Sequence, residues 1–236
     1  MTDLVSYVFA DGVATLTMDD GKANAMGPGM QAALNAALDR AEADKAIVVL
    51  TGRPGVFSGG FDLSVFKAGD ARATFQMLTG GAQLARRMLA YPHPVIAACS
   101  GHAVAMGLFL LQCADVRVGL SSGATFQANE VLIGMTLPHF ALETVRHRVA
   151  TPHVQLVGTA SGYTGDGAVL AGLLDEAVAP ESLASAVKAH VDRLKKAHPA
   201  SFTATKQRLN ALVLGTMPAA IEKDIADWKR LGAAQA

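Results

Sequence analysis

Two short segments made only of small or apolar residues constrain the fold of this chain more than any other feature. They cover residues 47–50 (Ile-Val-Val-Leu) and 95–99 (Val-Ile-Ala-Ala-Cys). Strands without polar side chains are typical of a parallel sheet that is buried on both faces. A segment with apolar residues at helical spacing precedes each of them, over residues 29–43 and 74–89. Helices that alternate with buried strands predict an α/β fold with a largely parallel sheet.

The same alternation extends in both directions along the chain. Residues 5–9 and 13–18 are β-rich and flank Ala10-Asp11-Gly12, which predicts a hairpin at the start of the sheet. A third unit follows the second buried strand, with a helix near residues 106–113 and a strand at 116–118. Ligands of such folds collect where parallel strands reach their carboxyl ends.

Only helical patterns follow Pro180, over residues 182–197, 201–214 and 218–229. We therefore expect an α/β core over residues 1–180 and a C-terminal helical segment over residues 181–236. A helical segment without strands of its own either mediates oligomerisation or covers the sheet, and the pattern leaves both open.

Composition and charge exclude several classes of function. The 20 Lys and Arg balance the 20 Asp and Glu, so we expect neither a nucleic-acid groove nor a polycationic membrane surface. Hydrophobic residues reach 51% and charged residues only 17%, which predicts a large core and buried subunit surface. The longest apolar stretch, residues 103–111, is too short for a membrane span, and the first residues lack a signal-peptide pattern, so we expect a cytoplasmic protein. Cys99 and Cys113 lack metal-ligand spacing, so we interpret both as reduced core residues and expect no metal site.

Two glycine-rich turns are predicted at the ends of the buried strands. Residues 55–63 (GVFSGGFDL) follow the first strand, and residues 100–109 (SGHAVAMGLF) follow the second. Small residues leave backbone N–H groups accessible, and the first N–H groups of a helix have no partner within it. Two such turns could donate to one oxygen, although each alone is consistent with a plain turn or close helix packing. We expect Asp62 and Asp115, beside these turns, to cap turns or helices.

A third segment, residues 126–134 (FQANEVLIG), places one carboxylate beside an apolar run. Loss of hydration among Val131, Leu132 and Ile133 would raise the pKa of Glu130 above its usual value of about 4.3 and make it a poised base. The alternative is that Asn129 and Glu130 cap a short helix.

In this order and spacing, the three segments resemble the crotonase, or enoyl-CoA hydratase/isomerase, superfamily. The resemblance includes residues 20–26 as the early Asn-Ala-Met turn, Cys-Ala-Asp at 113–115 and residues 166–178, with Asn129 where the family has Pro. It implies an α/β, crotonase-like (ClpP/crotonase) spiral of strand-strand-helix units with a C-terminal helical segment. It also implies an acyl-CoA substrate, no cofactor beyond the CoA that the substrate carries, and a homotrimer or dimer of trimers.

The resemblance also implies roles for individual residues. The backbone N–H groups of Phe61 and Met106 correspond to the two donors that hold the thioester oxygen, with Met106 where the family usually has Gly. The contacts with CoA fall on Lys22, Ala23, Ser58, Gly59 and Gly60. His139 and Phe140 replace the glycine-rich continuation of many hydratases and would lie near the acyl pocket, where His139 either fills space or acts as an auxiliary acid or base.

The chemistry implied depends on a missing carboxylate. Hydratases of this superfamily use two glutamates, but here the second is present as Glu130 while the first aligns with Phe109. A single carboxylate is poorly equipped both to activate a water and to manage a proton beside it. It suffices for a 1,3 proton shift, as in the superfamily's 3,2-enoyl-CoA isomerases. We therefore expect an isomerase that converts 3-enoyl-CoA to 2-enoyl-CoA, with Glu130 as the proton shuttle and Phe109 as an apolar wall.

Two other functions remain open from the sequence. One is a hydratase, hydrolase or other crotonase reaction in which His139 or an ordered water replaces the missing glutamate. The other is a non-catalytic acyl-CoA-binding protein, which the departures at Met106, His139 and Phe140 suggest.

Overall fold

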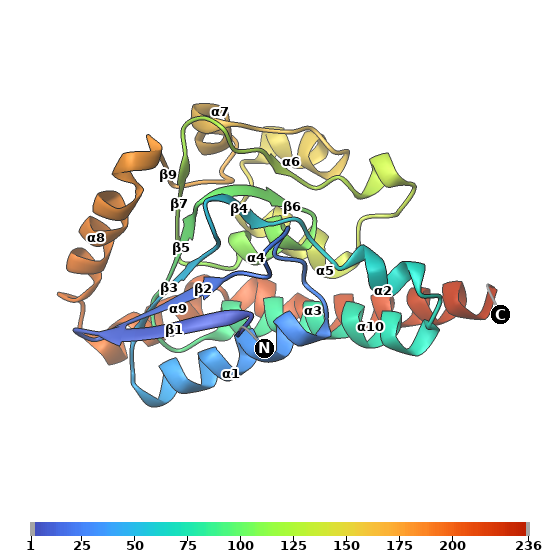
Figure 1. The fold of residues 1–236 in the computed structure, drawn as a ribbon, viewed down its shortest axis with the longest axis horizontal. Coiled ribbons are helices and arrows are strands. Elements are labelled where there is room, and N and C mark those ends of the chain that lie inside the picture. The colour runs from blue at the N-terminus through green and yellow to red at the C-terminus, as the bar shows by residue number, and fades with distance from the viewer. Residues whose placement is uncertain (1–2, 235–236) are drawn as a thin grey trace.

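The computed structural model describes residues 3–234, and within them the strands form two sheets. The main sheet contains β1 (Val5–Ala10), β2 (Val13–Met18), β3 (Ile47–Thr51), β5 (Val95–Cys99), β7 (Val116–Leu120) and β9 (Glu176–Val178), in that spatial order (Figure 1). β1 and β2 form the predicted antiparallel hairpin, and every other neighbouring pair is parallel. The predicted buried strands are therefore β3 and β5, at the centre of the sheet.

The second sheet contains β4 (Gly55–Ser58), β6 (Gly101–Val104) and β8 (Phe126–Gln127), all parallel. The prediction that the glycine-rich segments are turns is therefore wrong for their first residues, which form β4 and β6. The two strands approach so closely that a Cβ atom on Gly101 would lie 1.9 Å from the carbonyl carbon of Gly55. The glycines that permit this approach also remove the side-chain pattern by which a strand is recognised.

The strands occur in consecutive pairs, and a helical segment follows each pair. In each pair, β3-β4, β5-β6 and β7-β8, the first strand joins the main sheet and the second joins the small sheet. The helices that follow are α2 (Leu63–Lys67) and α3 (Ala71–Ala90), then α4 (Met106–Gln112), then α5 (His139–Arg148). This arrangement is the spiral of strand-strand-helix units that the resemblance predicts.

The remaining helices flank this spiral. They are α1 (Pro28–Ala43), α6 (Thr151–Gly158), α7 (Gly165–Leu170), α8 (Leu183–Leu194), α9 (Pro199–Leu209) and α10 (Ala211–Ala234). The predicted helix boundary before Pro218 is wrong, because α10 continues through this residue. The loss of one backbone hydrogen bond at Pro218 is offset by the packing of α10 along α3 and α5. No helix within residues 3–234 is long and apolar enough to cross a membrane.

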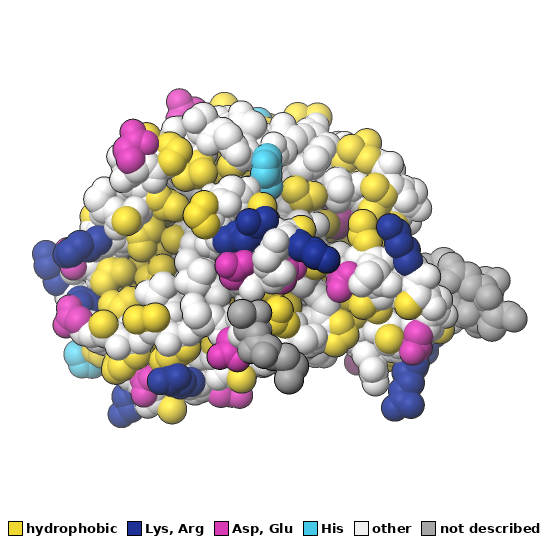
Figure 2. Space-filling view, in the orientation of Figure 1, with side chains coloured by type: hydrophobic (Ala, Val, Ile, Leu, Met, Phe, Trp, Pro, Cys, Tyr) yellow, Lys and Arg dark blue, Asp and Glu magenta, His cyan; other side chains and the backbone are white. Residues whose placement is uncertain are grey.

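Two apolar layers hold the sheets and helices together. The larger lies between the strands and helices α1, α3, α4, α5 and α10, and the smaller lies between the outer face of the main sheet and α8. Figure 2 shows further hydrophobic side chains on the left of the molecule, where α8 and the strands lie. Here a groove of about 550 Å³ separates α8 from β2 and β3. Cys99 and Cys113 are buried free thiols, as predicted, and burial raises the pKa of each to about 12.

Candidate active site

Three candidate residues follow the carboxyl ends of the three strands of the small sheet. In the register of this sheet, Ala103 pairs with both Ser58 and Phe126, so β4, β6 and β8 end at the same edge. Phe61, Met106 and Glu130 each follow the last residue of one of these strands within three positions. The fold thus brings three segments that are distant in the sequence to one edge, where ligands of parallel sheets bind.

The backbones that carry the Phe61 and Met106 N–H groups are in contact. Gly60 has φ +96°, and a Cβ atom on it would lie 2.7 Å from Cβ of Ala105 and 3.4 Å from the backbone nitrogen of Met106. Neither N–H donates to a protein acceptor within residues 3–234. Two neighbouring N–H groups without partners are the elements of an oxyanion hole.

Ala105 turns the chain from β6 directly into α4. Its φ of 51° and ψ of −126° lie in a region that residues with a side chain rarely occupy. Two hydrogen bonds fix this conformation: the Ala105 N–H donates to the Gln127 carbonyl at 2.9 Å, and the Phe109 N–H donates to the Ala105 carbonyl at 3.1 Å. The turn makes Met106 the first residue of α4, which leaves its N–H outside the hydrogen-bond ladder of the helix.

Glu130 is buried without a compensating charge. It opens a short 3₁₀ helix, Glu130–Ile133, and is only 5% exposed. Its Oε2 atom is sealed from solvent and has no hydrogen-bond partner in the described part of the chain. Burial raises the pKa of Glu130 to about 7, and the opposing effect of its own backbone N–H is smaller. A carboxyl group that titrates near neutrality can both take up and release a proton.

The physical reason predicted for this shift is partly wrong. The three apolar residues that follow Glu130 are exposed, Leu132 by 67%, so they do not provide its burial. Residues elsewhere in the chain must therefore enclose the carboxyl group. The capping alternative is also wrong, because Asn129 stands at the N-cap position without a side-chain hydrogen bond to the helix. Its Oδ1 atom is sealed and unpaired like Oε2 of Glu130.

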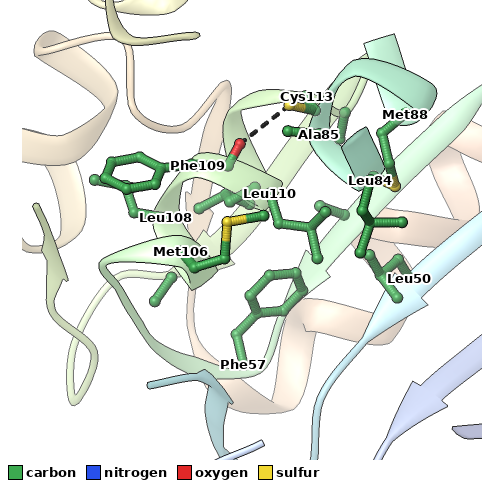
Figure 3. Close-up of a cluster of buried hydrophobic side chains, with 14 of the residues drawn as sticks. Leu50, Phe57, Leu84, Ala85, Met88, Met106, Leu108, Phe109, Leu110 and Cys113 are labelled. Carbon is green, nitrogen blue, oxygen red and sulfur yellow. Dashed lines mark hydrogen bonds between the residues drawn. The ribbon is translucent and has the colours of Figure 1, made fainter. Parts of the chain in front are cut away.

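Phe109 and Phe140 form an apolar pair. Both rings are fully buried, and they meet edge to face with centroids 5.9 Å apart. Figure 3 shows that α4 directs Phe109 away from the side on which Met106 packs with Phe57 and Leu84. The Met106 side chain is buried beside α3, so the residue that replaces the family's glycine finds space in the core.

His139 has a different environment from its neighbour Phe140. Its side chain is 44% exposed, and Nε2 lies 3.6 Å from Oδ2 of Asp227 on α10. The ring is therefore turned toward the C-terminal helix, and it is not buried with Phe109 and Phe140.

The residues expected to contact CoA lie together on two adjoining loops. The Gly59 N–H donates to the Ala23 carbonyl at 2.8 Å, and the Ser58 hydroxyl donates to the Asn24 carbonyl at 2.8 Å. Gly60 accepts the N–H of Met26 at 2.7 Å. Lys22, Ala23 and Gly59 are exposed, whereas Ser58 and Gly60 are buried.

Sequence reasoning gave no role to the side chain of Asn24. This residue is fully buried with φ 49°, and its Nδ2 donates to the carbonyls of Met18 at 2.9 Å and Phe57 at 3.2 Å. It thereby fixes the first loop to the end of β4. The Asn-Ala-Met turn is visible in the sequence, but the partners of the amide become evident only in the fold.

Asp62 has the capping role that was predicted, whereas Asp115 connects the start of β5 to α9 instead of capping a turn or a helix. Asp62 caps α2 by accepting the Ser64 N–H at 2.8 Å. Asp115 accepts the Val95 N–H at 2.8 Å and pairs with Nζ of Lys206 at 2.7 Å.

Known proteins similar to this chain point to one family. The family model described as Enoyl-CoA hydratase/isomerase matches residues 9–235. A putative enoyl-CoA hydratase from Thermus thermophilus is 32% identical over 200 residues, which are 82% of this chain and 78% of that protein. The peroxisomal enoyl-CoA delta isomerase 2 from Arabidopsis thaliana is 30% identical over 139 residues, which are 56% of this chain and 58% of that protein.

Solved structures from Mycobacterium tuberculosis are similar over nearly the whole chain. One, described as an enoyl-CoA isomerase, is 44% identical with a TM-score of 0.90 and covers 96% of this chain and 99% of its own. A second structure of the same protein, described there as a probable enoyl-CoA hydratase, is 43% identical with a TM-score of 0.93 and covers 96% of this chain and 97% of its own. With its strand-strand-helix spiral and the family model spanning nearly its full length, the chain belongs to the enoyl-CoA hydratase/isomerase family of enzymes in the crotonase superfamily.

Proposed function

We propose that this enzyme isomerises 3-enoyl-CoA to 2-enoyl-CoA by a 1,3 proton shift. The observation that carries the proposal is that the carboxyl group of Glu130 is sealed and unpaired within the described residues, while a buried phenylalanine, Phe109, stands where a hydratase would carry its other glutamate. Names of relatives do not decide between the reactions, because both names occur among them, and the M. tuberculosis protein is described by each in turn.

The proposed reaction uses Glu130 twice. The ionised carboxylate removes a proton from C2 of the acyl group, and the electron pair of that C–H bond delocalises over the double bond and the thioester carbonyl. The resulting dienolate oxygen accepts hydrogen bonds from the Phe61 and Met106 N–H groups. The carboxyl group of Glu130 then returns a proton to C4, which leaves the double bond between C2 and C3. Loss of one such N–H donor costs about 2.7–4 kcal/mol of transition-state stabilisation in comparable sites.

Hydration is disfavoured by the surroundings of Glu130. A water that attacks C3 needs a base, and C2 needs a proton, so two groups must act at the same double bond. Phe109 and Phe140 have no proton to exchange, and we propose that their buried rings keep water from that side of the acyl group. The proposed reaction requires no cofactor beyond the CoA of the substrate, which we propose contacts Lys22, Ala23, Ser58, Gly59 and Gly60.

The test compares two substrates and two variants. Wild-type protein is incubated with 3-hexenoyl-CoA and, separately, with 2-hexenoyl-CoA, and the products are separated by chromatography. We expect 2-hexenoyl-CoA from the first substrate, little 3-hydroxyhexanoyl-CoA from the second, and almost no turnover by Glu130→Gln. Glu143→Gln is the control, because Glu143 lies on α5 and is engaged by Arg146 and Thr216. Rapid hydration of 2-hexenoyl-CoA would favour a hydratase, and binding without any product would favour a non-catalytic protein.

A further inference from the structure

The first turn of α5 is capped by a residue of α10, the last helix of the chain. Asp224, on α10, is 2% exposed, and its carboxylate accepts the N–H of His139 at 2.7 Å and of Phe140 at 2.9 Å. The N-cap residue of α5 is Pro138, which has no side-chain acceptor of its own. These two N–H groups at the start of α5 therefore depend on α10 for their partner.

This cap lies one side-chain contact away from α4, the helix whose first residue is Met106. Phe140, whose N–H donates to Asp224, packs its ring edge to face against Phe109 of α4. Phe109 is also held through its backbone, because its N–H donates to Ala105 and its carbonyl accepts the Cys113 thiol at 3.1 Å (Figure 3). A displacement of the first turn of α5 would therefore change the packing of Phe140 against Phe109, and with it the position of α4, which begins at Met106.

We propose that Asp224 is a positioning residue for the oxyanion hole. It fixes the first turn of α5, and the Phe140–Phe109 contact then holds α4 so that the Met106 N–H points at the thioester oxygen. This inference rests on the role proposed above for Met106, and it does not depend on which reaction follows.

The experiment measures hydrogen bonding to the thioester without requiring turnover. Saturated hexanoyl-CoA labelled with ¹³C at C1 is bound to the protein, and the carbonyl chemical shift reports the strength of the hydrogen bonds that its oxygen accepts. Asp224→Asn keeps the shape of the side chain but cannot accept both N–H groups as a carboxylate does. Phe140→Leu removes the ring contact between Phe140 and Phe109, and it supplies the test if Asp224→Asn does not fold. Glu222→Gln, an exposed acid on the same helix, is the matched control.

We expect the downfield shift of the carbonyl on binding to fall by roughly half in Asp224→Asn and in Phe140→Leu, and to be unchanged in Glu222→Gln. With 3-hexenoyl-CoA, kcat should fall on the order of 10-fold, a fraction of the roughly 100-fold loss for a deleted donor, while KM stays within about twofold. Trp228, the single tryptophan, lies on α10 one turn after Asp224, and its fluorescence should stay that of the wild type.

The outcomes separate this inference from the isomerase proposal. An unchanged carbonyl shift in Asp224→Asn or Phe140→Leu would overturn it. So would a loss of shift that is accompanied, in both variants, by tryptophan emission like that of the unfolded chain, because the role would then be structural only. A wild-type protein that shifts the carbonyl but does not isomerise 3-hexenoyl-CoA would contradict the isomerase and leave the role of Asp224 to be decided by the carbonyl shift.

Discussion

Glu130 combines a raised proton affinity with the absence of a partner at Oε2. Desolvation penalises its ionised form, and neither a cation nor a hydrogen-bond donor from the described residues offsets that penalty at Oε2. Glu130 is therefore a stronger base than an ordinary glutamate, which suits the proposed removal of a weakly acidic proton beside a thioester.

The pH dependence of the reaction follows from this carboxyl group. If the ionised form is the base, as proposed, kcat/KM for 3-hexenoyl-CoA should rise with pH and level off above the pKa of about 7. An ordinary glutamate would place the midpoint near 4.3. Initial rates measured from about pH 5 to about pH 9 give this profile. A flat profile from about pH 6 upward would contradict the assignment.

Glu130 should also reduce the stability of the folded protein. Because burial raises its pKa from 4.5 to about 7, the folded state binds this proton more tightly than the unfolded chain does. The free energy of unfolding therefore falls as the pH rises from about 4.5 to about 7, and above this range the loss is on the order of 3 kcal/mol. We expect Glu130→Gln to have the larger free energy of unfolding near pH 8 and no such advantage near pH 4. Urea titrations at both pH values check this, and a variant without any gain at the higher pH would refute the prediction.

Gly60 provides the room in which the two N–H donors meet. In Gly60→Ala, the new methyl group would lie 2.7 Å from Cβ of Ala105, at a φ of +96° that is strained for alanine. We expect kcat to fall on the order of 100-fold and the free energy of unfolding to fall by about 1–3 kcal/mol. Gly215→Ala is the control, because no atom lies within 4 Å of the added Cβ. Wild-type kcat in Gly60→Ala would show that this contact does not shape the site.

At the scale of elements, apolar strands were predictable and glycine-rich strands were not. β3 and β5 are evident in the sequence because every residue of their predicted cores is apolar. β4 and β6 contain the glycines at 55 and 101, where contact between two backbones replaces side-chain packing. The continuation of α10 through Pro218 was also not predictable, because it depends on tertiary contacts with α3 and α5.

A buried ion pair connects helix α9, in the C-terminal helical segment, to the main sheet. Lys206 is 4% exposed, and its Nζ lies 2.7 Å from Oδ2 of Asp115, just before β7. Lys206→Met would leave the Asp115 carboxylate without its cation, so we expect the free energy of unfolding to fall by about 3–5 kcal/mol. Lys188→Met, which breaks the exposed pair with Asp192, should cost about 0–1 kcal/mol. Equal losses in the two variants, measured by urea titration, would contradict this account.

At the scale of the whole molecule, the site is assembled from segments that are far apart in the chain. The motif resemblance predicted Phe61, Met106 and Glu130, and the parallel register of the small sheet explains how the segments that carry them reach one edge. Asn24 and Asp224 could not be assigned from the sequence, because their roles consist of hydrogen bonds to distant backbone atoms. The division at residue 180, the trimer and the role of the C-terminal helices in assembly stay predictions.

The most direct test of the proposed chemistry follows one hydrogen atom. 3-Hexenoyl-CoA carrying deuterium at C2 is converted under single-turnover conditions, and the product is analysed by mass spectrometry and NMR. Because one carboxyl group removes and returns the proton, the account predicts 2-hexenoyl-CoA with part of the label at C4, and loss of this product in Glu130→Gln. Formation of 3-hydroxyhexanoyl-CoA as the main product, or unchanged turnover in Glu130→Gln, would contradict it.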